Sequence, residues 1–313
     1  MNAFLHHLAL GAPLFALILA GYLLIRIGGW SKSMTDHLTT FVFSVGLPAM
    51  MFRMMSGLSK LPPVDSRLLI AFFGACLGVF LLGRLVSWRF FGLDGLGQSV
   101  FGIGCIFSNN VMLGLPLAKA SLGDQAIPSV ALVLVFNAFV LWSLVSISAE
   151  WFRHRSISLK GFRDTLRGVL RNPIILAILG GTAFGLTGEA LPETIDSPLA
   201  MLGQTGVPLA LVALGMSLAE YDLRDQWRVS AVITMLKLVV LPLCVLGVAR
   251  LIGLPKMETM VVVLLASIGL GANVFLMARQ FKAVEEGVAG ALIMSTIGSA
   301  ITMPLFLAFA AHF

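Results

Sequence analysis

Ten apolar stretches, each long enough to cross a lipid bilayer as a helix, follow one another along the 313-residue chain. A helix rises about 1.5 Å per residue, so about 20 apolar residues span a hydrocarbon core of roughly 30 Å. Only 12% of the residues are charged, which is about half the share of an ordinary soluble domain. The sequence therefore predicts an all-α integral membrane protein whose main partner is the lipid bilayer.

Glycine, proline and charged residues separate the predicted spans, which cover roughly residues 5–27, 35–56, 67–91, 96–121, 125–150, 172–190, 196–219, 228–252, 257–280 and 285–312. This topology places 14 of the 21 Lys and Arg residues on one side of the membrane. By the positive-inside rule that side is cytoplasmic, so both termini are expected outside. The net charge of +6 is explained by these short loops, and no nucleic-acid partner is expected.

The two halves of the chain echo each other at a spacing near 160 residues. Pro13 recurs as Pro173 and Pro48 as Pro208, and the same offset carries Asn110 close to Asn273. Five spans per half would insert the second half from the opposite side of the membrane. We expect two inverted five-helix repeats, residues 1–150 and 172–313. The basic segment 151–171 joins them, and it either lies on anionic headgroups or docks a partner.

The segment "SNNVMLGLP", residues 108–116, interrupts the fourth span with Asn109, Asn110, Gly114 and Pro116. Non-helical backbone survives at membrane depth only inside protein or beside a water-filled cavity. The ninth span carries Gly269, Gly271 and Asn273 at the corresponding place. We therefore expect helices 4 and 9 to be broken and to cross, forming one anion site from half-helix ends and amide side chains. The alternative is a kink with a purely structural role.

Several motifs resemble the auxin efflux carrier family, which includes plant auxin exporters and bacterial carriers linked to malonate. They are "NNVMLGLP", "LPAMMF", "NPIILAILGG", "VPLALVALGMSLA", "LKLVVLP" and "GANVFLMARQF". The resemblance implies a scaffold of helices 1, 2, 6 and 7, often dimeric, and a transport domain of helices 3–5 and 8–10. It assigns Asn109, Asn273 and Pro48 to the substrate site.

The sequence departs from that family in two places. Gly269 stands where the family usually has a proline. The third span lacks the interior acidic residue of the plant exporters, which argues against a proton relay there.

The interior of the spans contains no Asp or Glu, which disfavours a cation substrate. Asn137 lies midway along the fifth span and joins either the polar cluster or an interhelical hydrogen bond. Lys237 lies about ten residues into the eighth span, too deep to snorkel. Three states are open to Lys237: a neutral amine, solvation by helix-end carbonyls, or pairing with the transported anion.

Cofactor and metal sites are not expected. Cys76, Cys105 and Cys244 lie in apolar runs, and the histidines lack ligand spacing. We interpret the chain as a secondary transporter of a small organic anion, such as malonate or an auxin-like acid, working by alternating access in a bacterial inner membrane. Two alternatives remain: a ligand-sensing receptor on the same fold, and a membrane-embedded enzyme, for which catalytic clusters are missing.

Overall fold

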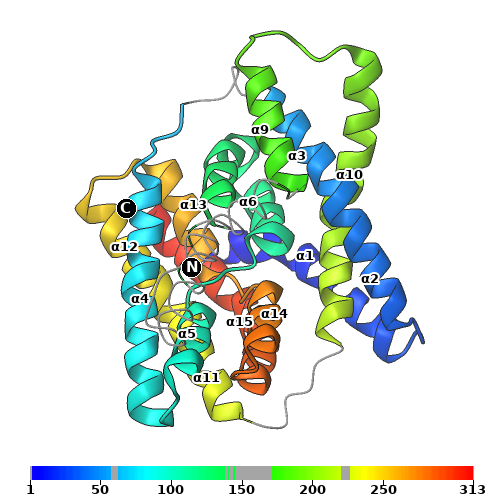
Figure 1. The fold of residues 1–313 in the computed structure, drawn as a ribbon. Helices are drawn as coiled ribbons and strands as arrows, with labels where there is room; N and C mark the ends of the chain where they lie inside the picture. Colours follow the sequence, from blue (N-terminus) through cyan, green and yellow to red (C-terminus); the bar gives the residue numbers. More distant parts are fainter. Residues whose placement is uncertain are drawn as a thin grey trace.

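The computed structural model describes residues 2–57, 63–137, 140, 144, 171, 173–219 and 226–312, and these residues are mostly helical (Figure 1). A described helix or pair of helices lies in each of the ranges that the sequence predicts to span the membrane. In the first half the elements are α1 (Asn2–Arg26), α2 (Lys32–Phe41), η1 (Val42–Gly46), α3 (Leu47–Ser56), α4 (Leu68–Phe91), α5 (Gly95–Gly104), η3 (Asn110–Gly114), α6 (Leu115–Leu122) and η4 (Asp124–Ala126).

Helical conformation continues from η4 through residues 127–137. In the second half the elements are α9 (Pro173–Gly185), α10 (Glu193–Leu218), α11 (Trp227–Met235), η5 (Leu236–Val240), α12 (Leu241–Leu251), α13 (Lys256–Ser267), α14 (Ala272–Phe281) and α15 (Glu285–Ala311). The basic linker predicted at 151–171 lies, except for Arg171, outside the described residues.

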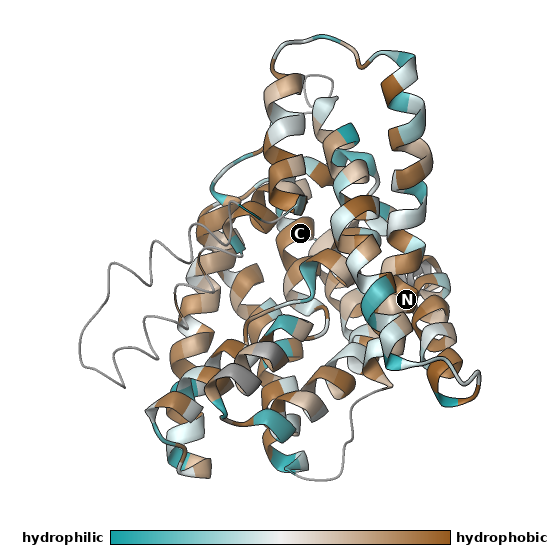
Figure 2. Ribbon diagram, turned by 45° about the vertical axis from the view of Figure 1, so that its right-hand side comes forward, coloured by the Kyte–Doolittle hydropathy of each residue, from teal (hydrophilic) through white to brown (hydrophobic). Residues whose placement is uncertain are grey.

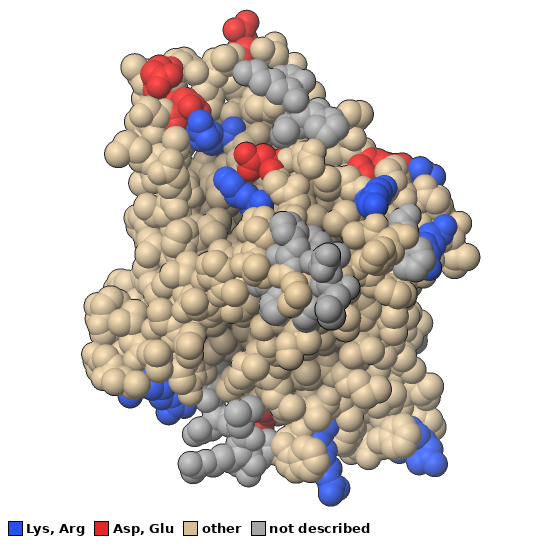
Figure 3. All heavy atoms as spheres, turned by 180° about the vertical axis from the view of Figure 1, so that it is seen from behind, with Lys and Arg blue, Asp and Glu red and all other residues tan. Residues whose placement is uncertain are grey.

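Within the described residues, five continuous helical stretches are long and apolar enough to cross a membrane: Lys32–Ser56, Leu68–Phe91, Glu193–Leu218, Trp227–Leu251 and Glu285–Ala311. Shorter apolar helices cover Ala12–Arg26, Asp124–Asn137 and Pro173–Gly185. Apolar residues dominate most helices (Figure 2). On the face shown in Figure 3, charged side chains gather toward the two ends of the molecule and a broad uncharged band lies between them. This distribution fits a chain inserted in a bilayer.

Among the described residues, three π-helical turns occur, and each ends two residues before a proline. The turns are η1, η3 and η5, and the prolines are Pro48, Pro116 and Pro242. A proline has no N–H to donate to the carbonyl four residues back. In each case the residue before the proline donates to the carbonyl five residues back, as Leu115 does to Asn110. Proline thus explains where the helices widen, and such turns frequently occur at functional sites.

Two helical regions are interrupted near their midpoints. The first interruption separates α5 from η3 and comprises residues 105–109, and the second separates α13 from α14 and comprises residues 268–271. Breaks therefore occur at both places where the sequence predicts them.

The helices pack into two groups, which meet where α1 packs against α15 (Figure 1). One group contains α1, α3, α9 and α10, with α1 against α10 and α3 against both α9 and α10. The other contains α4, α5 and α11–α15, in which α4 packs on α5 and α12, and α15 on α11 and α13. Small residues allow close approach in the first group: a side-chain carbon at Gly46 would lie 3.0 Å from Gly206 Cα. Such contacts are typical of membrane helices, which gain little from apolar burial against lipid.

Candidate functional site at the paired helix breaks

The two helix breaks lie side by side and are joined by backbone hydrogen bonds. Asn109 N donates to Gly269 O at 2.9 Å, and Gly271 N donates to Phe107 O at 2.9 Å. Ser108 and Leu270 form an antiparallel bridge between them. Backbone groups that leave a helix at membrane depth cost several kcal/mol unless they find partners, and here each break supplies partners for the other.

The two breaks approach so closely at Gly271 that a larger residue would not fit there. A side-chain carbon at Gly271 would lie 2.9 Å from Phe107 Cδ1 and 3.1 Å from Ser108 O. Gly269 is similarly confined on the α15 side, where the same addition would lie 2.8 Å from Thr296 Cα. The glycines predicted to mark the second break therefore allow it to pack closely, Gly271 against the first break and Gly269 against α15.

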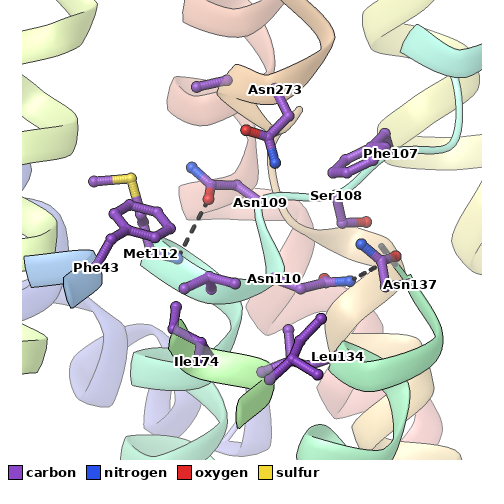
Figure 4. Close-up of a pocket in the computed structure, with 14 residues that line it drawn as sticks. Phe43, Phe107, Ser108, Asn109, Asn110, Met112, Leu134, Asn137, Ile174 and Asn273 are labelled. Carbon is purple, nitrogen blue, oxygen red and sulfur yellow. Dashed lines mark hydrogen bonds between the residues drawn. The ribbon is translucent and has the colours of Figure 1, made fainter. Parts of the chain in front are cut away.

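A cavity of about 90 Å³ lies beside the paired breaks (Figure 4). Residues from η1, η3, α9, the start of α14 and the helical stretch 127–137 line this cavity. The lining comprises Phe43, Phe107, Ser108, Asn109, Asn110, Val111, Met112, Leu134, Asn137, Ile174, Ile175, Gly271, Ala272 and Asn273. None of these side chains carries a formal charge. The cavity combines an apolar wall with a group of amides and one hydroxyl, the composition expected of a small-molecule site.

The amide of Asn109 is oriented by its own helix. Its Oδ1 accepts a hydrogen bond from Met112 N at 3.3 Å and thereby caps η3. Only the oxygen can accept from a backbone N–H, so the amide nitrogen faces away from the cap. That nitrogen, Asn109 Nδ2, is buried and has no protein partner in the described part of the chain. It is a donor without an acceptor beside the cavity.

Two more polar atoms of the lining are also buried without a protein partner in the described part of the chain. Asn110 Nδ2 donates to Asn137 Oδ1 at 3.3 Å, whereas Asn110 Oδ1 and Ser108 Oγ are buried with no partner among the described residues. Buried polar groups are ordinarily hydrogen-bonded, and leaving one unpaired costs about 1–3 kcal/mol. Three such atoms around one cavity indicate that a solute or water completes their bonding.

Two helix N-termini meet at this cavity. The η3–α6 helix starts at Asn110 and α14 starts at Ala272, and both starting residues line the cavity. Each N-terminus carries a partial positive charge from its unpaired N–H groups. In Figure 4 the Asn273 amide points from the start of α14 toward the amides of the first break. Asn273 is exposed, unlike Asn109 and Asn110. The electrostatic field of the cavity therefore suits an anion.

The structure brings together five of the nine predicted site residues. Asn109, Asn110, Asn137, Gly271 and Asn273 line the cavity, whereas Gly114, Pro116, Pro48 and Lys237 do not.

Three of the four residues outside the lining shape the helices near the cavity. Gly114 packs η3 against α13, where a side-chain carbon would lie 2.8 Å from Leu265 Cδ2. Pro48 and Pro116 follow the π turns that carry Phe43 and Asn110–Met112 into the lining. Lys237 is buried and bonds to the C-terminal carbonyls of α13.

Sequence reasoning missed the apolar part of the lining, chiefly Phe43, Met112, Leu134 and Ile174. A signal existed for two of them, since Phe43 and Met112 lie four or five residues before a mid-span proline. Among the described residues, no group of three or more His, Cys, Asp or Glu side chains is arranged to hold a metal ion.

A helical bundle of membrane-spanning length with a polar cavity between two broken helices has the construction of a membrane transport protein. The chain belongs to the auxin efflux carrier family: the family model described as "Membrane transport protein" matches residues 8–307.

Three relatives illustrate the range of this family. The chain is 26% identical over 296 residues to the "Putative malonate transporter" of Rhizobium meliloti (strain 1021), covering 93% of this chain and 92% of that protein. It is 25% identical over 292 residues to an "Uncharacterized transporter" of Methanothermobacter thermautotrophicus, covering 93% and 94%. It is 20% identical over 356 residues to "Auxin efflux carrier component 8" of Arabidopsis thaliana, covering 97% and 96%. Each relative is named as a transporter or carrier.

Proposed function

We propose that the protein is a secondary transporter that moves a small organic anion through the cavity at the paired breaks. One observation carries this proposal: three buried polar atoms without protein partners, Ser108 Oγ, Asn109 Nδ2 and Asn110 Oδ1, surround a cavity where two helix N-termini meet. Donors such as Asn109 Nδ2 bind carboxylate oxygens, and the helix ends favour their negative charge.

The substrate class that fits best is a short carboxylate, with malonate as the first compound to test. A cavity of about 90 Å³ is well below the roughly 300–1,000 Å³ of pockets for drug-sized ligands. The named function of the Rhizobium relative agrees with this size. An auxin-like acid carries a bulkier ring and is the second compound to test.

The mechanism we propose is alternating access between two helix groups. The group with α1, α3, α9 and α10 serves as the scaffold, and the group with α4–α6, the stretch 127–137 and α11–α15 serves as the transport domain. Packing within each group supports this division, and α1 contacts the other group at α6 and α15. In this scheme the halves 1–150 and 172–313 are inverted repeats, the location is a bacterial inner membrane with both termini outside, and two copies associate through their scaffolds.

Transport assays with Asn109→Ala and Asn273→Ala test the site. Each substitution removes an amide that lines the cavity, so we expect malonate counterflow in proteoliposomes to fall to a small fraction of the wild-type rate. Thermal unfolding of Asn273→Ala should stay close to wild type, because Asn273 is exposed. Asn109→Ala also loses the cap of η3, so we expect it to remain folded with a somewhat lower midpoint. Gln125→Ala is the matched control, since Gln125 is an exposed amide on η4 outside the cavity, and its counterflow should be normal.

Normal transport by both cavity variants would contradict the proposed substrate site. Counterflow also separates the carrier from a ligand-sensing receptor on the same fold. A receptor would show a malonate-dependent rise in unfolding temperature without any exchange of labelled substrate.

A further inference from the structure

Lys237 is the only Lys or Arg side chain that is fully buried among the described residues. It lies in the π turn η5, near the middle of the helical stretch Trp227–Leu251. None of the described ion pairs involves it. A cation at this depth must be stabilised by something other than a carboxylate.

The partners of Lys237 are backbone oxygens at the C-terminal end of α13. Its Nζ donates to Ala266 O at 2.6 Å and to Ile268 O at 2.8 Å. The last carbonyls of a helix have no intrahelical partner and carry the negative end of the helix dipole. Both features favour a protonated ammonium, which is a donor with no accepting capacity.

Two other carbonyls at this break also have donors. Thr302 Oγ1 donates to Ser267 O at 2.9 Å, and Asn109 N donates to Gly269 O at 2.9 Å. Lys237 therefore donates to two of the carbonyl oxygens that are freed where α13 ends. Its two carbonyl partners are separated in sequence by one residue, so they converge on one point where the ammonium lies.

At the first break, backbone N–H groups donate to freed carbonyls without a side-chain cation. Phe107 N donates to Ile103 O at 2.9 Å, and Gly271 N donates to Phe107 O at 2.9 Å. Backbone amides thus serve these carbonyls at the first break. Among the side chains that the structure describes, a buried lysine donates to break carbonyls only at the second break, where it adds a positive charge.

Carbonyl oxygens of unwound backbone and half-helix C-terminal ends are the groups that bind coupling cations in transporters with broken helices. We propose that Lys237 is a tethered cation: its ammonium occupies a monovalent-cation site formed by Ala266 O and Ile268 O, and it supplies a fixed positive charge to the transport domain. The site belongs to the chain itself, so no free sodium ion is needed there. Truncation of the lysine opens the site to a free cation.

The cation site rests on the contacts at α13 alone. Its effect on transport rests on the proposed anion function, because the fixed charge attracts a substrate bound at the start of α14, four residues beyond Ile268. The two parts are tested by different measurements, so the failure of one is distinguishable from the failure of the other.

Lys237→Ala tests the site through thermal unfolding of the purified protein in sodium chloride and in choline chloride at equal ionic strength. In choline we expect a lower midpoint than for wild type, because two carbonyls lose their donor. Sodium should raise the midpoint of the variant saturably, whereas the wild-type midpoint should not distinguish the two cations. A variant as stable as wild type in choline, or one with no sodium-specific rise, would overturn the proposal.

Lys256→Ala is the matched control. Lys256 Nζ also donates to a helix C-terminal carbonyl, Ala311 O at 2.7 Å, but on an exposed side chain. Its loss should produce no sodium-specific change, because water replaces the ammonium there. A sodium response in this control equal to that of Lys237→Ala would show that the effect is not specific to the buried site, and would also overturn the proposal.

Lys237→Gln provides a second test that does not depend on the fold of the alanine variant. Its amide retains donor capacity but lacks the charge, so we expect a folded protein without a sodium response and with an apparent Kd for malonate raised several-fold. Unchanged affinity for malonate would refute the role of the charge. If wild type itself binds no anion, the proposed function fails, and the sodium response of Lys237→Ala remains the test of the cation site.

Discussion

Asn109 shows how one side chain can cap a helix and line a cavity at once. Its oxygen accepts from Met112 N and caps η3, which fixes the plane of the amide. Its nitrogen is thereby turned away from the cap and left without a protein partner among the described residues. Alanine would remove both functions together. Aspartate separates them, because a carboxylate keeps the capping oxygen but cannot donate when ionised.

Asn109→Asp therefore tests the sign of the substrate charge. The carboxylate should still cap η3 and lies near a positive helix end, so folding should be retained. A negative charge in the cavity should repel an anion, and we expect malonate counterflow and the malonate-induced rise in unfolding temperature to be lost. The comparison is with Asn109→Ala, which removes the donor without adding a charge.

Two results would contradict this expectation. One is transport of malonate by Asn109→Asp at the wild-type rate, which would place the anion elsewhere. The other is that Asn109→Asp takes up an organic cation while it still binds neutral analogues of malonate. That result would indicate that the cavity does not select anions.

At the scale of elements, the broken helices depend on residues that permit contact between backbones. The second break is confined between the first break and α15, and Gly269 and Gly271 are the positions where space is smallest. Where the family resemblance predicts a proline, Gly269 instead allows Thr296 of α15 to approach. Leu270 N, next in the chain, donates to Ser295 Oγ at 2.8 Å. The break is therefore held in place by α15 and by the other break.

Gly269→Ala should destabilise the break. The added carbon would lie within 3.0 Å of backbone atoms of Thr296, so α15 or the break must shift, at a cost of about 1–3 kcal/mol. We expect a lower thermal midpoint and slower malonate counterflow. Gly74→Ala is the control, since Gly74 is exposed on α4 with no atom within 4 Å of an added carbon. Equal midpoints for the two variants would show that the break tolerates expansion.

At the scale of the whole molecule, the distribution of charge predicts the orientation of the chain in the membrane. Six of the fourteen basic residues that the sequence assigns to the cytoplasmic side occur between Arg153 and Arg171. By contrast, the connection from α9 to α10, residues 186–192, contains Glu189 and no Lys or Arg. The positive-inside rule therefore predicts that the two connections face opposite sides of the membrane.

Single cysteines test this orientation in a variant whose three native cysteines, Cys76, Cys105 and Cys244, are replaced. A cysteine at a position from 151 to 167 should react with an impermeant thiol reagent only from the cytoplasmic side. A cysteine in place of Thr187, which lies in the opposite connection, should react only from outside. The reverse pattern would invert the proposed topology, and labelling of both positions from one side would exclude an odd number of spans between them.

The sequence by itself determined the class of the protein. Length and spacing of apolar runs dictate membrane helices, since a bilayer accepts few other backbone conformations. The residues of "SNNVMLGLP" located the first break, because glycine, proline and paired amides oppose a continuous apolar helix. That motif predicted Asn109 and Asn110 for the site, and the corresponding place in the ninth span predicted Gly271 and Asn273. Whether Asn137 joins them was left open by the sequence.

Only the tertiary structure decided how these residues are used. Pairing of Asn109 N with Gly269 O joins positions 160 residues apart in sequence, and no local pattern specifies which backbone group receives which partner. The same holds for the apolar wall of Phe43, Leu134 and Ile174, whose residues are ordinary in any membrane helix. For Lys237 the sequence left three states open, and the structure places its Nζ within hydrogen-bond distance of the carbonyls of Ala266 and Ile268. The burial and the hydrogen-bond partners of Lys237 depend on which helix end lies beside it. The packing of the helices determines which end that is.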